Sequence, residues 1–266
     1  MWKKEGAVQV QPPVAGVARR FEGRVALVVG AASPVGRATA VRLATEGAAV
    51  ACIDPEPEAL GETVEALRIL GGRATSLRSD PMDGESVGRA VDQVANELGR
   101  PSVLCVVPGT SGYAHTLDIG RAQWDRALAE GLRGPFLAIQ AALPYLQHPQ
   151  GGSVVVVLHA AGFGGSAYRA VDAAVHGGLL SLSRSLAAEL AGRKVRVNAV
   201  AAELPDGGPE EPSLPVGADP RAVARSRGPF GPVPPDLVAA AVVFLASEDA
   251  AATSGAVLRV DGGQSL

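Results

Sequence analysis

Short apolar runs alternate with longer helix-like segments along most of the chain, and this alternation restricts the possible folds more than any other feature. Near-continuous runs rich in β-branched residues are typical of strands that are buried on both faces of a parallel sheet. The segments between the runs are long enough to hold crossover helices. The sequence therefore predicts a single doubly wound α/β domain with a Rossmann-like, seven-stranded parallel sheet flanked by helices.

The predicted strands are Val25–Val29, Val50–Ile53, Ala74–Leu77, Val103–Val107, Val154–Leu158, Val195–Val200 and Ala256–Val260. The predicted helices are Gly36–Thr45, Pro57–Leu70, Gly84–Leu98, Ala122–Leu146, Tyr168–Leu190 and Pro235–Ala246.

Composition limits the partners and the compartment. The 266 residues, 47% of them hydrophobic, are enough to bury a large core without disulfides. The net charge of −3 gives no reason to expect a nucleic acid or an anionic membrane as a partner. We find no signal peptide and no membrane-spanning apolar stretch, so we expect a cytoplasmic protein. Cys52 and Cys105 lie in apolar runs and are predicted to be reduced thiols, and the four histidines show no metal-binding spacing, so we expect no metal.

Two segments fall outside the regular alternation. Residues 1–21 are polar and contain prolines, and we expect a flexible tail ahead of the domain at 22–266. Residues 203–232 contain seven prolines and five glycines, which predicts a long, mobile surface loop on the substrate side.

Several motifs resemble those of the short-chain dehydrogenase/reductase family, in order and spacing, from about residue 22 to the C-terminus. The resemblance implies a nicotinamide-dependent oxidoreductase that forms homo- or hetero-oligomers with subunits of the same type, through helices 122–146 and 168–190. The matching segments are Val29–Gly36, Gly47 to Asp54, Asp80 to Asp83, Trp124-Asp125-Arg126, Gly151-Gly152-Ser153, Arg196–Val200, Phe244–Ser247 and Val260–Gly263.

The segment from Val29 to Gly36 resembles the family's glycine-rich turn, at which backbone N–H groups and a helix dipole receive a pyrophosphate. Gly30, Ser33, Val35 and Gly36 are therefore candidate cofactor-binding residues. Pro34 replaces the middle glycine and removes one N–H group. The alternative is a turn that only packs the helix against the strand.

An acidic residue at the end of the second strand fits the ribose of an adenosine. Asp54 holds this position, and no Arg or Lys follows it, which favours NAD over NADP. Its alternative role is that of a turn or cap residue ahead of Pro55. The resemblance further places Asp80 and Pro81 beside the adenine, and Gly109 at the end of a changed motif, Val106-Val107-Pro108-Gly109.

The reactive side chains of the family are largely replaced. The family uses Asn, Ser, Tyr and Lys together, and the lysine helps the tyrosine to lose its proton. Alignment places Gly131 at the Asn position and His159 at the Ser position, while Tyr168-xxx-Asp172 takes the place of the family's YxxxK motif. The segment between His159 and Tyr168 is a few residues short. Because residues four apart share a helix face, we expect the Asp172 anion to oppose ionisation of the Tyr168 phenol.

Three functions follow from these candidate catalytic residues, Tyr168, His159 and Asp172. The first is a pseudoenzyme or partner subunit that keeps an adenosine half-site for NAD. The second is an atypical NAD(P)H-dependent reductase, for example of enoyl thioesters, in which His159 or Tyr168 supplies a proton. The third is a lyase, isomerase or cyclase in which Asp172 orients His159 as a base. In the alternative structural roles, His159 is a hydrogen-bonded strand-end residue, Tyr168 packs, and Asp172 lies on a solvated face or pairs with Arg169.

Overall fold

A computed structural model describes residues 19–109, 111–203, 214–224 and 228–264. Its seven strands form one parallel sheet in the order β3-β2-β1-β4-β5-β6-β7, which confirms the predicted doubly wound fold. The order reverses between β1 and β4, the position at which open α/β sheets bind their ligands. The strands are β1 Val25–Val29, β2 Ala49–Asp54, β3 Ala74–Arg78, β4 Pro101–Val106, β5 Gly152–His159, β6 Val195–Ala202 and β7 Val257–Val260.

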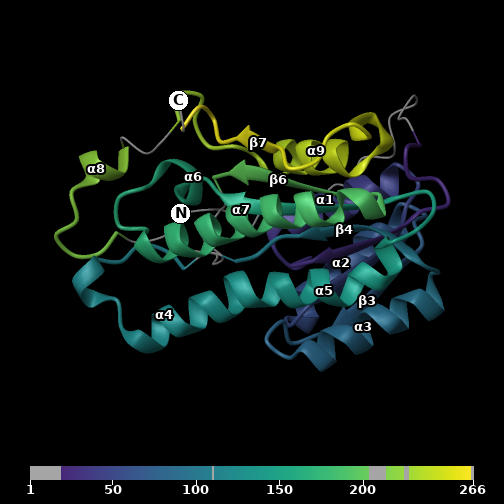
Figure 1. Cartoon of the computed structure of the whole chain (residues 1–266). Coiled ribbons are helices and arrows are strands. Elements are labelled where there is room, and N and C mark those ends of the chain that lie inside the picture. Colours follow the sequence, from purple (N-terminus) through teal and green to yellow (C-terminus); the bar gives the residue numbers. More distant parts are fainter. Residues whose placement is uncertain (1–18, 110, 204–213, 225–227, 265–266) are drawn as a thin grey trace.

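Helices cover both faces of the sheet (Figure 1). Alternate residues of each strand point to opposite faces, and the apolar core is therefore divided into two layers. One layer packs against α1, α2 and α9, and the other packs against α3, α5 and α7. The helices are α1 Pro34–Thr45, α2 Pro57–Ile69, α3 Gly84–Glu97, α4 Arg121–Leu128, α5 Gly134–Leu146, α6 Ala161–Gly164, α7 Ala170–Leu190, α8 Pro220–Ala224 and α9 Pro235–Ala246. The shorter turns are η1 Thr116–Asp118, η2 Ala129–Arg133, η3 Ala191–Arg193 and η4 Glu248–Ala250.

Two predicted helices differ from the observed ones. The predicted helix 122–146 is divided into α4 and α5 by a π-helical turn at Ala129–Arg133. The predicted helix 168–190 begins at Ala170, because Tyr168 has a left-handed backbone with φ of 65°, which is incompatible with an α-helix. The second difference moves Tyr168 out of the helix on which the sequence placed it.

The two irregular segments are described only in part. Residues 1–18 of the predicted tail lie outside the described residues, as do 204–213 and 225–227 of the predicted loop. Within the described part of that loop, residues 220–224 form the short helix α8. Among the described residues, no helix has both the length and the apolar composition that crossing a membrane requires.

Candidate functional site

The turn between β1 and α1 is fixed by contacts with main-chain atoms. Gly30 has a φ of +83°, and a Cβ atom there would lie 2.0 Å from the carbonyl oxygen of Val107. A Cβ atom on Gly36 would lie 2.0 Å from the carbonyl oxygen of Gly30. Only glycine fits at either position, so both glycines serve the close packing of helix against strand.

The side chain of Ser33 caps the first turn of α1. Its Oγ accepts a hydrogen bond from the N–H of Gly36 (3.1 Å) and donates one to the carbonyl oxygen of Gly30 (2.7 Å). Pro34 opens the helix without an N–H group, so Val35, which is buried, supplies the first N–H of α1. The turn therefore keeps the helix dipole but offers an anion fewer donors than a turn with three glycines.

Asp54 joins the end of β2 to this turn. Its Oδ2 accepts a hydrogen bond from the N–H of Ala32 (3.0 Å), and its Oδ1 accepts one from Glu56 (3.1 Å). Burial raises the pKa of Asp54, while the two hydrogen bonds oppose that shift. Each carboxylate oxygen keeps a lone pair beyond the one it uses here, so the turn role does not exclude a ribose hydroxyl as a further donor.

The remaining cofactor candidates are more exposed. Asp80 follows β3, and its Oδ1 accepts a hydrogen bond from the N–H of Met82 (2.8 Å), which makes it a turn residue. Pro81 packs against the backbone at Gly134, where an added Cβ atom would lie 3.1 Å from the Cβ of Pro81. Gly109 is exposed and has open space where a side chain would be. The space beside Gly109 is therefore open to a ligand.

Tyr168 contacts loops that precede and follow it in the chain. Its backbone carbonyl accepts a hydrogen bond from the N–H of Ala114 (2.8 Å), and its hydroxyl accepts one from the N–H of Asp219 (2.9 Å). The ring lies edge-on to that of His115 with centroids 5.2 Å apart, and Nε2 of His115 donates to the carbonyl oxygen of Val216 (3.0 Å). Since Tyr168 precedes α7, the expectation that it shares a helix face with Asp172 is wrong.

Asp172 forms a buried ion pair with Arg169. The distance from Nη1 of Arg169 to Oδ2 of Asp172 is 2.8 Å, and the two residues are 4% and 1% exposed. Oδ1 of Asp172 accepts a hydrogen bond from the N–H of Ser111 (2.6 Å). The guanidinium of Arg169 lies 3.9 Å from the centre of the Tyr113 ring, a cation–π contact. The expectation of an ion pair with Arg169 is confirmed, and that of a solvated face is wrong.

His159 ends β5 and is buried. Its Nδ1 accepts a hydrogen bond from the N–H of Ala161 (3.0 Å), and its Nε2 has no partner. Burial, together with the charge of Arg169, lowers the pKa of His159 to about 3. His159 is therefore not hydrogen-bonded to Asp172, and this result removes the base-and-orienter pair on which the lyase hypothesis depended.

His176 lies beside His159 and was not among the residues that the sequence singled out. It is fully buried on α7, one turn after Asp172, and its ring centre lies 6.0 Å from that of His159. Burial lowers the pKa of His176 to about 4, although the nearby carbonyl of Gly109 opposes that shift. The four-residue spacing between Asp172 and His176, which puts both on one face of α7, is the signal in the sequence that points to His176.

Gly131 lies in the π-helical turn η2 and is buried. A Cβ atom there would lie 2.5 Å from Cγ1 of Val175, so no side chain fits unless Val175 moves.

The described residues contain no group of three or more metal-ligating side chains.

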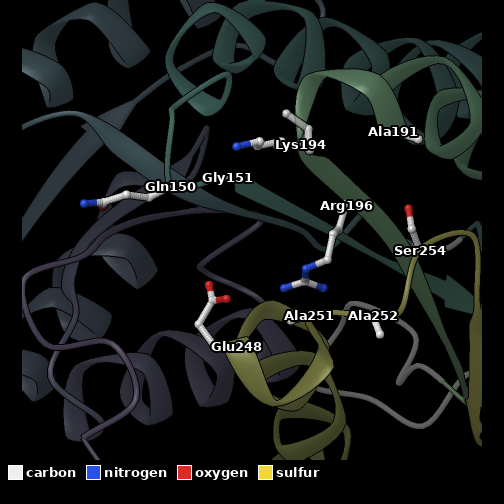
Figure 2. A pocket seen from close by; sticks show the side chains of 11 residues that line it. Gln150, Gly151, Ala191, Lys194, Arg196, Glu248, Ala251, Ala252 and Ser254 are labelled. Atoms are coloured by element: carbon white, nitrogen blue, oxygen red, sulfur yellow. The ribbon is translucent and has the colours of Figure 1, made fainter.

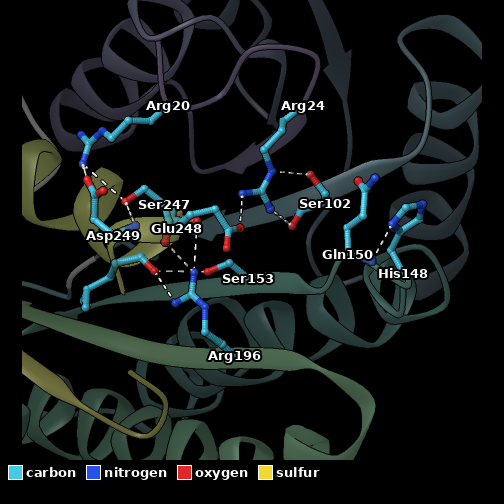
Figure 3. Close-up of polar contacts among 12 residues, drawn as sticks. Arg20, Arg24, Ser102, His148, Gln150, Ser153, Arg196, Ser247, Glu248 and Asp249 are labelled. Carbon is cyan, nitrogen blue, oxygen red and sulfur yellow. Dashed lines mark hydrogen bonds and ion pairs between the residues drawn. The ribbon is translucent and has the colours of Figure 1, made fainter. Parts of the chain in front are cut away.

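A separate cavity of about 370 Å³ lies at the opposite end of the strands, where β5 and β6 begin. Figure 2 shows Lys194, Arg196 and Glu248 around it. Arg196 donates hydrogen bonds to the carbonyl oxygens of Leu245 and Ser247 at the end of α9 (2.7 and 2.9 Å; Figure 3). Arg196 thus satisfies the free carbonyls of a helix terminus, and we assign this region a structural role.

Comparison with known proteins gives the family. The family model described as Enoyl-(Acyl carrier protein) reductase matches residues 30–265. The chain is 34% identical to the 3-oxoacyl-(acyl-carrier-protein) reductase FabG of Thermotoga maritima, over 92% of this chain and 98% of that protein. It is 39% identical to the cis-4-hydroxycyclohexanecarboxylate dehydrogenase of Sinomonas cyclohexanicum, over 91% and 97%.

A solved structure agrees with these sequence matches. Carveol dehydrogenase from Mycobacterium avium in complex with NAD superposes with a TM-score of 0.81 at 28% identity, over 92% of this chain and 98% of that one. The parallel sheet with its glycine-rich first turn defines a Rossmann-like dinucleotide-binding class. Within that class, the chain belongs to the short-chain dehydrogenase/reductase family of oxidoreductases.

Proposed function

We propose that this protein binds NAD mainly through the adenosine part of the cofactor and does not catalyse ordinary ketone reduction or alcohol oxidation. The observation that carries the proposal is the buried ion pair of Asp172 with Arg169 on the helix where the family resemblance expects a phenol and an amine. The guanidinium does not lose its proton in proteins, and its charge stabilises the carboxylate as an anion. This pair therefore has no proton to exchange with a carbonyl oxygen.

The observed start of α7 changes how the family motif is aligned. When the motif is counted on the helix itself, Asp172 and His176 take its two polar positions, one turn beyond Tyr168 and Asp172. This alignment also removes the shortage of residues after His159. A carboxylate then replaces the tyrosine and a neutral imidazole replaces the lysine, so the residues on the nicotinamide side do not fit the usual chemistry.

The residues on the adenosine side do fit the cofactor. The Gly30–Gly36 turn would receive the pyrophosphate at the start of α1, and Asp54 would accept a ribose hydroxyl. A buried acid at this position would repel the 2′-phosphate of NADP, and Pro55 and Glu56 offer no compensating positive charge. When bound, NAD supplies a hydride donor or acceptor, and this chain's residues hold its adenosine end.

Calorimetric titration with NAD, ADP and NADP tests the proposal. We expect ADP to bind within about threefold of NAD, and NADP to bind at least about tenfold more weakly. The variant Asp54→Asn should weaken NAD and ADP equally, with Asp92→Asn, at an exposed acid on α3, as the matched control. Binding of NAD about a hundredfold tighter than ADP would show that the nicotinamide side also contributes, and would contradict the proposal.

A role as a partner subunit is consistent with this half-site. Trp124 on α4 and Phe136 on α5 are 37% and 38% exposed in the single chain, in the region that the family resemblance associates with assembly. Such a subunit would assemble with a short-chain dehydrogenase that retains Tyr and Lys. Co-expression with such a relative from the same source, followed by native mass spectrometry, should give mixed oligomers; exclusively homomeric assemblies would contradict this role.

The names of the relatives favour a second candidate, an active but atypical NAD(P)H-dependent reductase. The matching family model describes enoyl reductases, and the two relatives named above are a reductase and a dehydrogenase. Reduction of an activated enoyl thioester needs less help from a phenol than ketone reduction does. A screen for NADH consumption across ketones and enoyl thioesters, with His159→Ala as control, distinguishes the two. Turnover that depends on His159 would establish the second candidate and overturn the first.

A further inference from the structure

A groove of about 560 Å³ lies between α1 and α9 on the surface of the molecule. Pro34 and Glu46, at the two ends of α1, both line it, so the groove follows the whole helix. A helix of 12 residues is about 18 Å long. The floor is formed by Ala38, Val41 and Ala239, and the first two are only half-buried. The groove is therefore long, narrow and lined by small apolar side chains.

The charged side chains along the groove already have partners. Nη1 of Arg37 lies 3.2 Å from Oε2 of Glu62, and Nε of Arg42 lies 3.2 Å from Oε1 of Glu46. A charged occupant would have to compete with these ion pairs and lose part of its own hydration. An uncharged occupant would cover the apolar floor without disturbing them, so the groove favours an uncharged, extended segment.

The polypeptide enters the folded domain beside one end of this groove. Nε and Nη2 of Arg20 donate hydrogen bonds to the two carboxylate oxygens of Glu46 (2.7 and 2.9 Å), and Glu46 is 2% exposed. The N–H of Phe21, which is fully buried, donates to the carbonyl oxygen of Glu46 (3.0 Å). These contacts hold the start of the described chain at the C-terminal end of α1. Whatever precedes Arg20 in the sequence therefore starts next to the groove.

The sequence that precedes this anchor matches the groove in chemistry and in length. Residues 12–18 read Pro-Pro-Val-Ala-Gly-Val-Ala, with no charge and no side chain larger than that of valine. Seven extended residues span about 23 Å at roughly 3.3 Å each, which is enough to follow α1. Because the segment is tethered at one end, its effective concentration at the groove is on the order of millimolar. A weak apolar contact is sufficient to hold it under these conditions.

We propose that residues 12–18 bind in the groove between α1 and α9 of their own chain. The bound segment covers the exposed parts of Ala38 and Val41, and burial of this apolar surface stabilises the contact. A segment from a second copy of the chain has the same side chains but lacks the tether, so it competes poorly. This contact goes beyond the proposed function and does not depend on NAD binding.

Disulfide trapping in the full chain tests the position of the segment. The eight residues of helix from Glu46 back to Ala38 cover about 12 Å, and the five extended residues from Arg20 back to Ala15 cover about 17 Å from the same end of the groove. In the double variant Ala15→Cys/Ala38→Cys, the two thiols should therefore come within disulfide distance. We expect a cross-link within one chain, which is measured as a shift in electrophoresis without reducing agent.

The matched control places the second cysteine near the same anchor but outside the groove. Ala251 is exposed and lies two residues after Asp249, whose carboxylate accepts a hydrogen bond from Arg20 (2.8 Å). The pair Ala15→Cys/Ala38→Cys should oxidise at least about tenfold faster than Ala15→Cys/Ala251→Cys. The native Cys52 and Cys105 are buried and should not react. Equal rates for the two pairs, or cross-links mainly between two chains, would overturn the proposal.

Hydrogen exchange measures the same contact without cysteines. The amides of residues 14–18 should exchange at least about tenfold more slowly than in a free peptide of the same sequence. Val17→Asp should restore the exchange rate of the free peptide, because it places a charge on the apolar floor. Val8→Asp, which adds the same charge outside residues 12–18, should leave the protection unchanged. Exchange at the free-peptide rate in the wild type, or equal loss of protection in both variants, would contradict binding in the groove.

Discussion

The β1–α1 turn and the start of α7 lie at the same end of the sheet, but they are built by different means. In the first region, Gly30 and Gly36 approach main-chain atoms so closely that no side chain fits. In the second region, the arrangement depends on pairs of side chains, chiefly Asp172 with Arg169 and His159 with His176. The glycines tolerate almost no substitution, because any side chain there would collide with the main chain. A pair of side chains can be replaced by another pair within the same fold. The glycine-rich turn can therefore persist in a family while the side chains at the start of α7 change.

The largest effect on stability is expected in the β1–α1 turn. Gly30→Ala places a Cβ atom against the carbonyl of Val107 at a left-handed φ, and we expect a loss of more than about 4 kcal/mol in the free energy of unfolding, measured by urea denaturation. The control is Gly112→Ala, which has a φ of +75° but open space around the Cβ position, and should lose about 1 kcal/mol. Equal losses in both variants would show that the contact with Val107 is unimportant.

The next largest effect is expected at the buried ion pair of Arg169 and Asp172. Removing it tests whether side-chain contacts stabilise the start of α7. Asp172→Leu leaves Arg169 buried without its acid and should cost about 3–5 kcal/mol by the same measurement. The double variant Arg169→Met/Asp172→Leu should recover most of this loss, because it removes both charges together. If the losses of the two single variants simply add, the two residues are not energetically coupled.

The histidine pair gives this region a pH dependence of its own. The folded-state pKa values of about 3 and about 4 lie below the ordinary value of 6.5, so the unfolded chain binds more protons as the pH falls through this window. The stabilisation is complete above about pH 6.5 and is lost toward pH 4, by about 1.4 kcal/mol per pH unit for each histidine. His176→Leu should reduce the slope of unfolding free energy against pH by one such contribution, whereas parallel curves for variant and wild type would contradict the buried, neutral state.

The smallest effect is expected at Tyr168, whose hydroxyl accepts a hydrogen bond from the N–H of Asp219. Tyr168→Phe removes only that bond, so global stability should change by no more than about 1 kcal/mol. Hydrogen exchange of the Asp219 amide should accelerate about fivefold or more, because its hydrogen-bond acceptor is gone. Tyr145→Phe, which removes a hydroxyl bonded to Asp92, should leave this amide unchanged. Unchanged exchange in Tyr168→Phe would show that this contact does not hold the segment around Asp219.

The sequence predicted the sheet, its flanking helices and the glycine-rich turn because each rests on local patterns. Runs such as Val154–Leu158 are recognisable as buried strands, and Gly30 and Gly36 mark a turn that accepts no side chain. The start of α7 was missed because nothing local signals the left-handed backbone of Tyr168, a residue type that rarely adopts it. Because Tyr168 precedes α7, it does not share a helix face with Asp172.

The pairing at the reactive end was decided only by the tertiary structure. The sequence contains Asp172, Arg169, His159 and His176, but it does not fix which of them meet, since a partner is chosen by side-chain direction and distance across elements that are separate in the chain. Folding buries Asp172 against Arg169 and places the ring of His159 beside that of His176, with centres 6.0 Å apart. Burial then excludes water, which keeps Asp172 and Arg169 together as a charge pair and keeps both histidine rings neutral.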